Sequence, residues 1–193
     1  TVHQKFILSD SSTTDVTKQG KITGSNNAGD GGGISVNVLR AGYDPVFIMK
    51  GGNITGNTAE NGGGIDVRGG YEVTLNGGSI SGNTALRKGG GLFLSNCNST
   101  MNAGTISDNT AQNGSGAYIN FCNFTMHGGR ISGNAASVSG GGVYFDHHMG
   151  SFTMDNGDIT GNTARINGGG LNLVGYSFIG GTANISGNHK TAN

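Results

Sequence analysis

The sequence predicts an all-β chain wound into a right-handed, three-stranded parallel β-helix of about seven coils, each of about 26 residues. Three observations lead to this fold. The motif Gly-x-Ile-Ser/Thr-Gly/Asp-Asn recurs along the chain, and a glycine triplet followed by alternating apolar residues comes after most of its copies. No stretch shows a helical spacing of apolar residues. Repeats that cannot bury their own apolar face must stack on their neighbours.

The first predicted strand of each repeat is centred on an isoleucine with polar or small neighbours. Alternation directs each isoleucine inwards, so that all of them form one core column. These residues are Ile22, Ile54, Ile80, Ile106, Ile131, Ile159 and Ile185. The asparagine three residues later is expected to bond the backbone at a tight turn or an asparagine of the next coil. These residues are Asn57, Asn83, Asn109, Asn134, Asn162 and Asn188, with Ser25 in the first coil.

The second predicted strand follows a glycine triplet, which is Gly-Ser-Gly in one repeat. Glycine permits a positive φ and a close approach of two backbones. The triplets are not phosphate-binding loops, because no helix and no Lys-Ser/Thr pair follows them. The inward residues of this strand are the pairs Ile34/Val36, Ile65/Val67, Leu92/Leu94, Ala117/Ile119, Val143/Phe145 and Leu171/Leu173.

The third predicted strand contributes two more core columns. One contains Phe47, Val73, Phe124, Phe152 and Phe178. The other contains Met49, Leu75, Met101, Met126 and Met154. Methionine adapts to irregular gaps in a core, so this column is interpreted as packing and not as a metal or redox site.

Composition excludes several classes of partner. Eleven basic and eleven acidic residues cancel, which argues against nucleic acid and against an anionic membrane surface. No apolar run is long enough for a transmembrane helix, so no membrane insertion is predicted. The chain begins at Thr1 without an apolar leader, so a signal peptide is expected to be absent or already removed. No cofactor is expected.

The two cysteines, Cys97 and Cys122, are 25 residues apart, which is one coil. They are therefore expected to stack as neighbours at the spacing of adjacent strands, about 5 Å. That distance permits a disulfide and equally permits two reduced thiols in a core column. Two cysteines without a nearby histidine pair do not make a zinc site.

A search for catalytic residues finds no convincing set. The acids expected to lie on different columns are Asp66, Asp108, Asp146, Asp155 and Asp158. The densest polar spot combines Asp146, His147 and His148 with His127 and Asp155. It is interpreted as a solvated loop with a surface pair between His127 and Asp155, although such a group could bind a stray metal ion. No catalytic residue and no metal site are therefore predicted.

The outward residues in the middle of the second strand include three consecutive aromatics, Phe93, Tyr118 and Tyr144. The whole row reads Ser35, Asp66, Phe93, Tyr118, Tyr144 and Asn172. Exposed rings about 4.8 Å apart would form a flat platform on which sugar rings stack. The alternative is a stack that only stabilises the sheet or is covered by a neighbouring loop or domain. Phe93, Tyr118 and Tyr144 are the predicted ligand-binding residues.

The ends of the chain lack the full repeat. Residues 1–19 are predicted to be an N-terminal cap, in which Phe6, Ile7 and Leu8 can form a strand over the first coil. Residues 20–193 are predicted to be the β-helix, continuing into a further region of a longer protein.

The repeats resemble those of a known group of proteins. Residues 77–85 (GGSISGNTA), followed by Gly89-Gly90-Gly91-Leu92, are similar to the right-handed β-helix repeats of bacterial adhesin-like surface proteins. They are loosely similar to polymorphic outer-membrane protein repeats, with Ile in place of Phe and usually Gly in place of Ala. The resemblance covers roughly residues 20–188. It implies the β-helix fold and an extracellular or cell-surface setting.

These observations predict a non-catalytic, adhesin-like module of a secreted or cell-surface bacterial protein. Its expected partner is a host or environmental glycan, or a surface protein, beside adjoining domains of the same chain. One alternative is a polysaccharide-degrading lyase or hydrolase, which needs clustered carboxylates on one face. The other is a structural spacer without a ligand.

Overall fold

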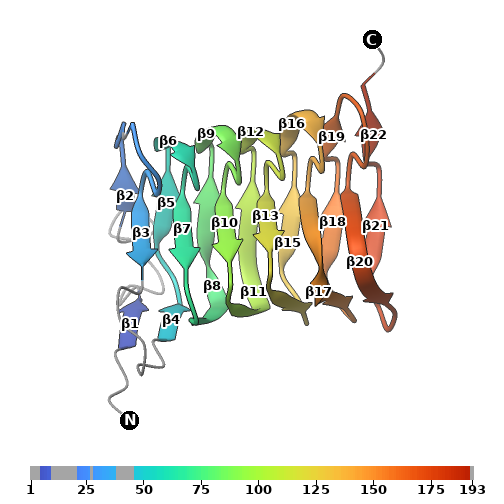
Figure 1. Ribbon diagram of the computed structural model, residues 1–193, viewed down its shortest axis with the longest axis horizontal. Coiled ribbons are helices and arrows are strands. Elements are labelled where there is room, and N and C mark those ends of the chain that lie inside the picture. Colours follow the sequence, from blue (N-terminus) through green and yellow to red (C-terminus); the bar gives the residue numbers. More distant parts are fainter. Residues whose placement is uncertain (1–4, 10–20, 27, 38–45, 192–193) are drawn as a thin grey trace, which may run out of the picture.

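The computed structural model describes residues 5–9, 21–26, 28–37 and 46–191 (Figure 1). Every described element is a β-strand, and every pairing between strands is parallel. The strands build a β-solenoid of about six turns with a spacing of about 26 residues. The predicted all-β solenoid is therefore confirmed, while the three-stranded form of its coil, its handedness and a seventh complete coil stay predictions. None of the described elements is a helix long and apolar enough to cross a membrane.

The predicted isoleucine strands stack in register. They are β2 (Lys21–Thr23), β5 (Asn53–Thr55), the second part of β8 (Glu72–Ser81), the second part of β11 (Asn98–Ser107), β15 (Arg130–Ser132), β18 (Asp158–Thr160) and β21 (Asn184–Ser186). The pairing joins all seven isoleucines into one column. The five inner ones are buried, whereas Ile22 and Ile185 lie in the end coils and are partly or well exposed.

The second and third predicted sets are also present. The second set is β3 (Ile34–Asn37), β7 (Ile65–Arg68), β10 (Leu92–Ser95), β13 (Ala117–Asn120) and the first parts of β17 (Val143–Met154) and β20 (Leu171–Ile179). The third set is β1 (Lys5–Leu8), β4 (Val46–Met49), the first parts of β8 and β11, β14 (Asn123–Met126) and the second parts of β17 and β20. The inward residues of these two sets form the apolar core together with the buried isoleucines of the first set.

A fourth set of short strands, not predicted from the sequence, follows the asparagine turn of each coil (Figure 1). It is a six-stranded sheet of β6 (Thr58–Asn61), β9 (Thr84–Lys88), β12 (Thr110–Asn113), β16 (Ala135–Ser139), β19 (Thr163–Ala164) and β22 (His189–Lys190). Its inward residue is an alanine in five of these strands. Because alanine gives almost no apolar alternation, these strands are hard to see in the sequence.

The asparagine turn is a continuous buried ladder, as the sequence analysis allowed. In each step the side-chain Oδ1 accepts hydrogen bonds from the backbone N–H and the Nδ2 of the preceding asparagine, at 2.9–3.1 Å. Each Nδ2 also donates to the carbonyl of an isoleucine in the coil before. Five of the six asparagines have no exposed surface. The ladder satisfies polar groups that the turn would otherwise bury unpaired.

One predicted core residue is in a different place. Phe152 pairs with Ser177 and not with Phe178, which lies in register with the outward Thr153 and is 61% exposed. The bend that joins the second set of strands to the third is shorter in β20 than in β17. The register between the two strands therefore shifts between Asp146 and Ser151. The expectation that Phe178 belongs to the core column was therefore wrong.

The N-terminal strand is present as predicted for Phe6, Ile7 and Leu8. This strand, β1, pairs with β4, and the Phe6 ring stacks on Phe47 with centroids 5.6 Å apart. It thus extends the third set of strands by one member. Residues 1–4 and 10–19 of the predicted cap lie outside the described residues.

Candidate functional site

The middle residues of the second set of strands form one outer row, as predicted. Backbone pairing places Phe93 beside Tyr118, and Tyr118 beside Tyr144. Their rings stack with centroids 5.5 and 5.3 Å apart and interplanar angles of 2° and 14°. We call Phe93, Tyr118 and Tyr144 the aromatic row. Asp66 continues this row on one side and Asn172 on the other.

The exposure predicted for the aromatic row is wrong for two of its three rings. Phe93 is 7% exposed and Tyr118 is 1% exposed, whereas Tyr144 is half-buried. The guanidinium carbon of Arg68 lies 4.5 Å from the centre of the Phe93 ring, and Nζ of Lys88 lies 4.6 Å from the centre of the Tyr118 ring. Cationic side chains are attracted to ring faces, and their methylene stems cover them. Phe93 and Tyr118 therefore offer no free platform to a sugar.

Asp146 holds the tyrosine end of the row. The Tyr118 hydroxyl donates a hydrogen bond to Oδ2 of Asp146. Burial raises the pKa of the Tyr118 phenol, and the bond to Asp146 raises it further. Burial also raises the pKa of Tyr144, with the negative charge of Asp146 as the second cause. Both phenols therefore stay protonated at neutral pH, where they can donate hydrogen bonds but cannot act as bases.

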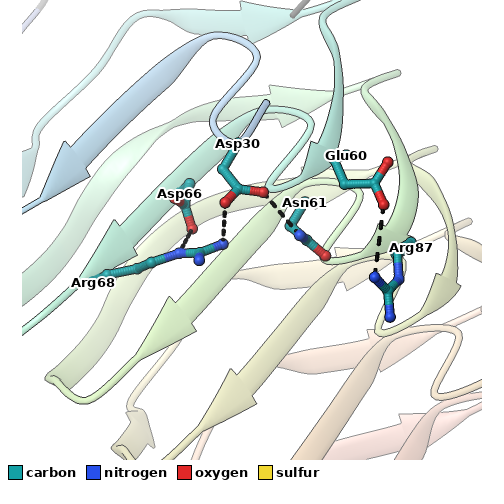
Figure 2. A network of polar contacts seen from close by, with 6 residues as sticks. All are labelled: Asp30, Glu60, Asn61, Asp66, Arg68 and Arg87. Carbon is teal, nitrogen blue, oxygen red and sulfur yellow. Dashed lines mark hydrogen bonds and ion pairs between the residues drawn. The ribbon is translucent and has the colours of Figure 1, made fainter. Parts of the chain in front are cut away.

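A charged network lies at the other end of the row (Figure 2). Arg68 Nε donates to Oδ1 of Asp66 at 2.9 Å, and Arg68 Nη2 lies 2.8 Å from Oδ2 of Asp30. Asn61 Nδ2 donates to Oδ1 of Asp30 at 2.8 Å. Asp66 is fully buried, and its Oδ2 has no hydrogen-bond partner among the described residues. Burial raises the pKa of Asp66 to about 6, although Arg68 opposes the shift.

Protonation of Asp66 is expected to stabilise the fold as pH falls from about 7 to about 4. Its pKa of about 6 in the folded chain lies above the value of about 3.9 for a solvated aspartate. The folded chain therefore binds this proton more tightly than the unfolded chain, and the free energy of unfolding rises as pH decreases through this window. The gain should level off below about pH 4, at no more than about 3 kcal/mol.

The measurement is urea unfolding of the wild type and Asp66→Asn at several values across that pH range. Asparagine carries no titrating proton here, so the difference between the two proteins isolates Asp66. The wild type should gain stability relative to the variant towards acid. A difference that stays constant with pH would contradict this account.

Aromatic, histidine and methionine side chains, all exposed except the half-buried His147, gather where three successive coils bend from the second set of strands to the third. Phe121 lies between β13 and β14, residues 147–149 lie within β17, and Tyr176 lies in β20. We call Phe121, His147, His148, Met149 and Tyr176 the aromatic corner. Phe121 is 46% exposed and Tyr176 is 75% exposed. Of this group, only the two histidines were predicted as part of a polar cluster.

The side chains of the aromatic corner contact one another across the coils. The His147 ring lies against Phe121, with centroids 3.7 Å apart. The Met149 N–H donates to Nδ1 of His147 at 2.9 Å, so the proton of the neutral ring lies on Nε2. A hollow of about 360 Å³ is lined by His148, Gly175 and Tyr176. The corner thus combines flat rings, polar nitrogen atoms and a shallow recess.

The backbone of Phe121 is in the left-handed region, with φ of 52°. Hydrogen bonds between coils show that Asn96 and Gly69 hold the same place one and two coils earlier, and both also have positive φ, at 56° and 87°. Glycine and asparagine tolerate this conformation, whereas it is strained for a bulky side chain. The turn itself therefore does not favour phenylalanine at position 121.

The predicted surface pair between His127 and Asp155 is confirmed, with Nδ1 and Oδ2 2.8 Å apart. Arg130 and Asp158 form a second exposed pair at 3.1 Å. Such pairs on a solvated surface contribute little to stability. Within the part of the chain that the structure describes, no group of three or more His, Cys, Asp or Glu side chains is arranged to hold a metal ion.

Comparison of the chain with protein-family models, with curated proteins and with solved structures finds no match. A solenoid fold by itself does not determine a function. Function is therefore inferred from the geometry of the aromatic row, the charged network and the aromatic corner.

Proposed function

We propose that this chain is a non-catalytic, adhesin-like module of a secreted or cell-surface bacterial protein and that it binds a glycan through the aromatic corner. The bacterial surface setting rests on the resemblance of the repeats. The binding role rests on one observation, which is an exposed phenylalanine held in a strained backbone conformation. Strain of this kind concentrates at functional sites.

The chemistry of the aromatic corner suits a sugar. The flat faces of Phe121 and Tyr176 can stack on the apolar C–H faces of sugar rings. The imidazole of His147 and the Tyr176 hydroxyl supply polar atoms for sugar hydroxyls. The recess beside His148 and Tyr176 gives the surface a concave part, which a ligand needs to bury its own surface.

The aromatic row has a supporting role in this proposal. Phe93 and Tyr118 are covered by Arg68 and Lys88, so they stiffen the wall from which the corner projects. Tyr144 is half-buried and remains the one member of the row that a ligand could touch. The predicted platform is thus replaced by a site further along the same coils.

A polysaccharide-degrading enzyme is less well supported. Asp30 and Asp66 converge on one guanidinium group, and Asp66 is fully buried. A pair of carboxylates that attacks a glycosidic bond must flank that bond from both sides. A buried and ion-paired aspartate cannot do so.

Replacing Phe121 with asparagine is expected to stabilise the protein or leave its stability unchanged. Asparagine relieves the left-handed strain, which is worth about 1–2 kcal/mol, but it loses the contact with the His147 ring. Chemical unfolding of the wild type and Phe121→Asn measures the balance. A loss above about 2 kcal/mol would mean that the ring is needed for folding and would remove the main support for a binding role.

Glycan-array binding tests the proposal directly. The wild type should bind a defined set of glycans, and the double variant Phe121→Asn/Tyr176→Ala should lose at least about tenfold in affinity. Ile166→Ala is the matched control, because Ile166 is an apolar residue of similar exposure, 42%, outside the aromatic corner. Absence of binding by the wild type, or equal binding by the double variant, would contradict the proposal and favour a structural spacer.

A further inference from the structure

The two cysteines lie beneath the aromatic corner and face each other. Cys97 lies between β10 and β11, and Cys122 lies at the corresponding bend between β13 and β14. Both are buried and not bonded to each other, and their Sγ atoms are 2.9 Å apart. The predicted stacking is therefore confirmed.

The flanking backbone holds this pair in register. Ser95 pairs with Asn120 before the bend, and Asn98 pairs with Asn123 after it. The two cysteines therefore belong to neighbouring parallel segments, whose spacing of about 4.8 Å lies within the Cα range of natural disulfides. Closing the Sγ–Sγ distance to the bonded length of about 2.05 Å needs only a small side-chain rotation.

The two thiols differ in reactivity. The Cys97 N–H donates to Sγ of Cys122 at 3.1 Å. A hydrogen bond from the Cys97 thiol lowers the pKa of Cys122, burial opposes this shift, and backbone hydrogen bonds add to the lowering. The same thiol–thiol bond, followed by burial, raises the pKa of Cys97. Cys122 is therefore the better nucleophile, and Cys97 lies beside it as a resolving thiol.

We propose that Cys97 and Cys122 are an oxidation site at which a peroxide converts the thiol pair into a reducible disulfide that ties two successive coils together. This inference does not depend on the proposed glycan binding.

The reaction has two balanced steps. The Cys122 thiol first releases its proton to solvent, and the thiolate attacks one oxygen of hydrogen peroxide, so that an S–O bond forms and the O–O bond breaks. The departing hydroxide takes up a proton from solvent, which balances the one released, and becomes the first water. The Cys97 sulfur then attacks the sulfenic acid at Cys122, so that the S–S bond forms and the S–O bond breaks. The departing hydroxide takes the Cys97 proton and becomes the second water. The thiol pair loses two electrons, and the peroxide gains them.

Peroxide is a suitable oxidant because it is little larger than water. The outer side of the bend is formed by Asn96 and Phe121, which are exposed. A small fluctuation of these residues would admit peroxide to the thiols, whereas a bulky disulfide reagent would need a larger opening. Dithiothreitol should reverse the product.

The test uses the whole chain treated with hydrogen peroxide and analysed by intact mass and peptide mapping. The expected product has lost two hydrogen atoms, contains a peptide cross-linked between Cys97 and Cys122, and returns to the starting mass with dithiothreitol. The oxidised protein should also melt on the order of 10 °C higher than the reduced one, because the bond closes a loop of about 25 residues in the unfolded chain. Addition of oxygen without a cross-link, a bond between two molecules, or thiols that stay reduced would each overturn the proposal.

Two single variants test the order of the steps. Cys97→Ser keeps the Cys122 nucleophile and should accumulate added oxygen at Cys122. Cys122→Ser keeps only Cys97 and should react at least about tenfold more slowly. Equal rates would overturn the assigned roles. The mass and melting measurements on the wild type need no variant, so a variant that fails to fold leaves the disulfide itself testable.

Discussion

Replacing Asn109 with alanine is expected to lower the free energy of unfolding by about 4 kcal/mol, because it breaks the middle of the buried ladder. Asn109 Oδ1 accepts from the backbone N–H and the Nδ2 of Asn83, at 2.9 and 3.1 Å. Its Nδ2 donates to the Ile80 carbonyl and to Oδ1 of Asn134, both at 3.0 Å. Alanine would leave the buried backbone N–H of Asn83 unpaired, at a cost of about 1–3 kcal/mol, and would also remove the buried side-chain bonds to Ile80, Asn83 and Asn134.

Asn102→Ala is the matched control for this prediction. Asn102 also lies one coil from another asparagine and donates to Oδ1 of Asn76 at 2.8 Å, but this pair is exposed. Water can replace the lost bond, so a change below about 0.5 kcal/mol is expected. Urea unfolding of both variants makes the comparison. Similar losses in the two variants would show that burial of the ladder is not what makes it stabilising.

Replacing Gly91 with alanine is expected to cost about 3 kcal/mol or more, since there is no room for a methyl group. A Cβ at Gly91 would lie 2.7 Å from the Gly116 carbonyl oxygen, 2.9 Å from Asn109 Nδ2 and 2.9 Å from Ile106 Cγ2. The first atom is backbone, and the other two belong to the ladder and the core. None of the three can move without disturbing the next coil.

Gly82→Asp is the control for this substitution. A Cβ at Gly82 would lie no closer than 3.7 Å to another side chain, at Thr55 Oγ1. The next coil has Asp108 at the corresponding position, with a φ of 56° that matches the positive φ of Gly82. Because the fold already accepts an aspartate there, Gly82→Asp should cost only about 1 kcal/mol. If thermal and urea unfolding ranked the two variants in the opposite order, the close contacts of Gly91 would not be the limiting feature.

The fold was largely predictable because each coil repeats the same local pattern. When the same residue type recurs once in every coil, parallel stacking brings its copies into contact. The period of the repeat is therefore enough to predict the isoleucine column and the asparagine ladder. The errors lie where the period or the pattern weakens. Phe178 was misplaced because the last coil has a shorter bend, and the strands after the ladder were missed because alanine marks their inward positions.

The candidate site was less predictable, although two signals were present in the sequence. Arg68 follows Asp66 by two residues on one strand, so alternation places both side chains on the outer side of the sheet. This could have indicated that Arg68 covers the Phe93 ring of the next coil. Phe121 comes four residues after Ala117, the first residue of β13. In the two coils before, Asn96 and Gly69 likewise come four residues after Leu92 and Ile65, which begin β10 and β7. That alignment could have identified the left-handed position.

The sequence by itself determined the solenoid, its apolar columns, the stacked cysteines and the stacking of Phe93, Tyr118 and Tyr144, since all of these follow from period and alternation. Only the tertiary structure decided which of these groups meet solvent. Lys88 reaches the Tyr118 ring from the end of another strand, and Asp30 reaches Arg68 from the coil before. Alternation records the side of the sheet on which a residue lies, whereas its exposure depends on the long side chains that fold over it from neighbouring coils.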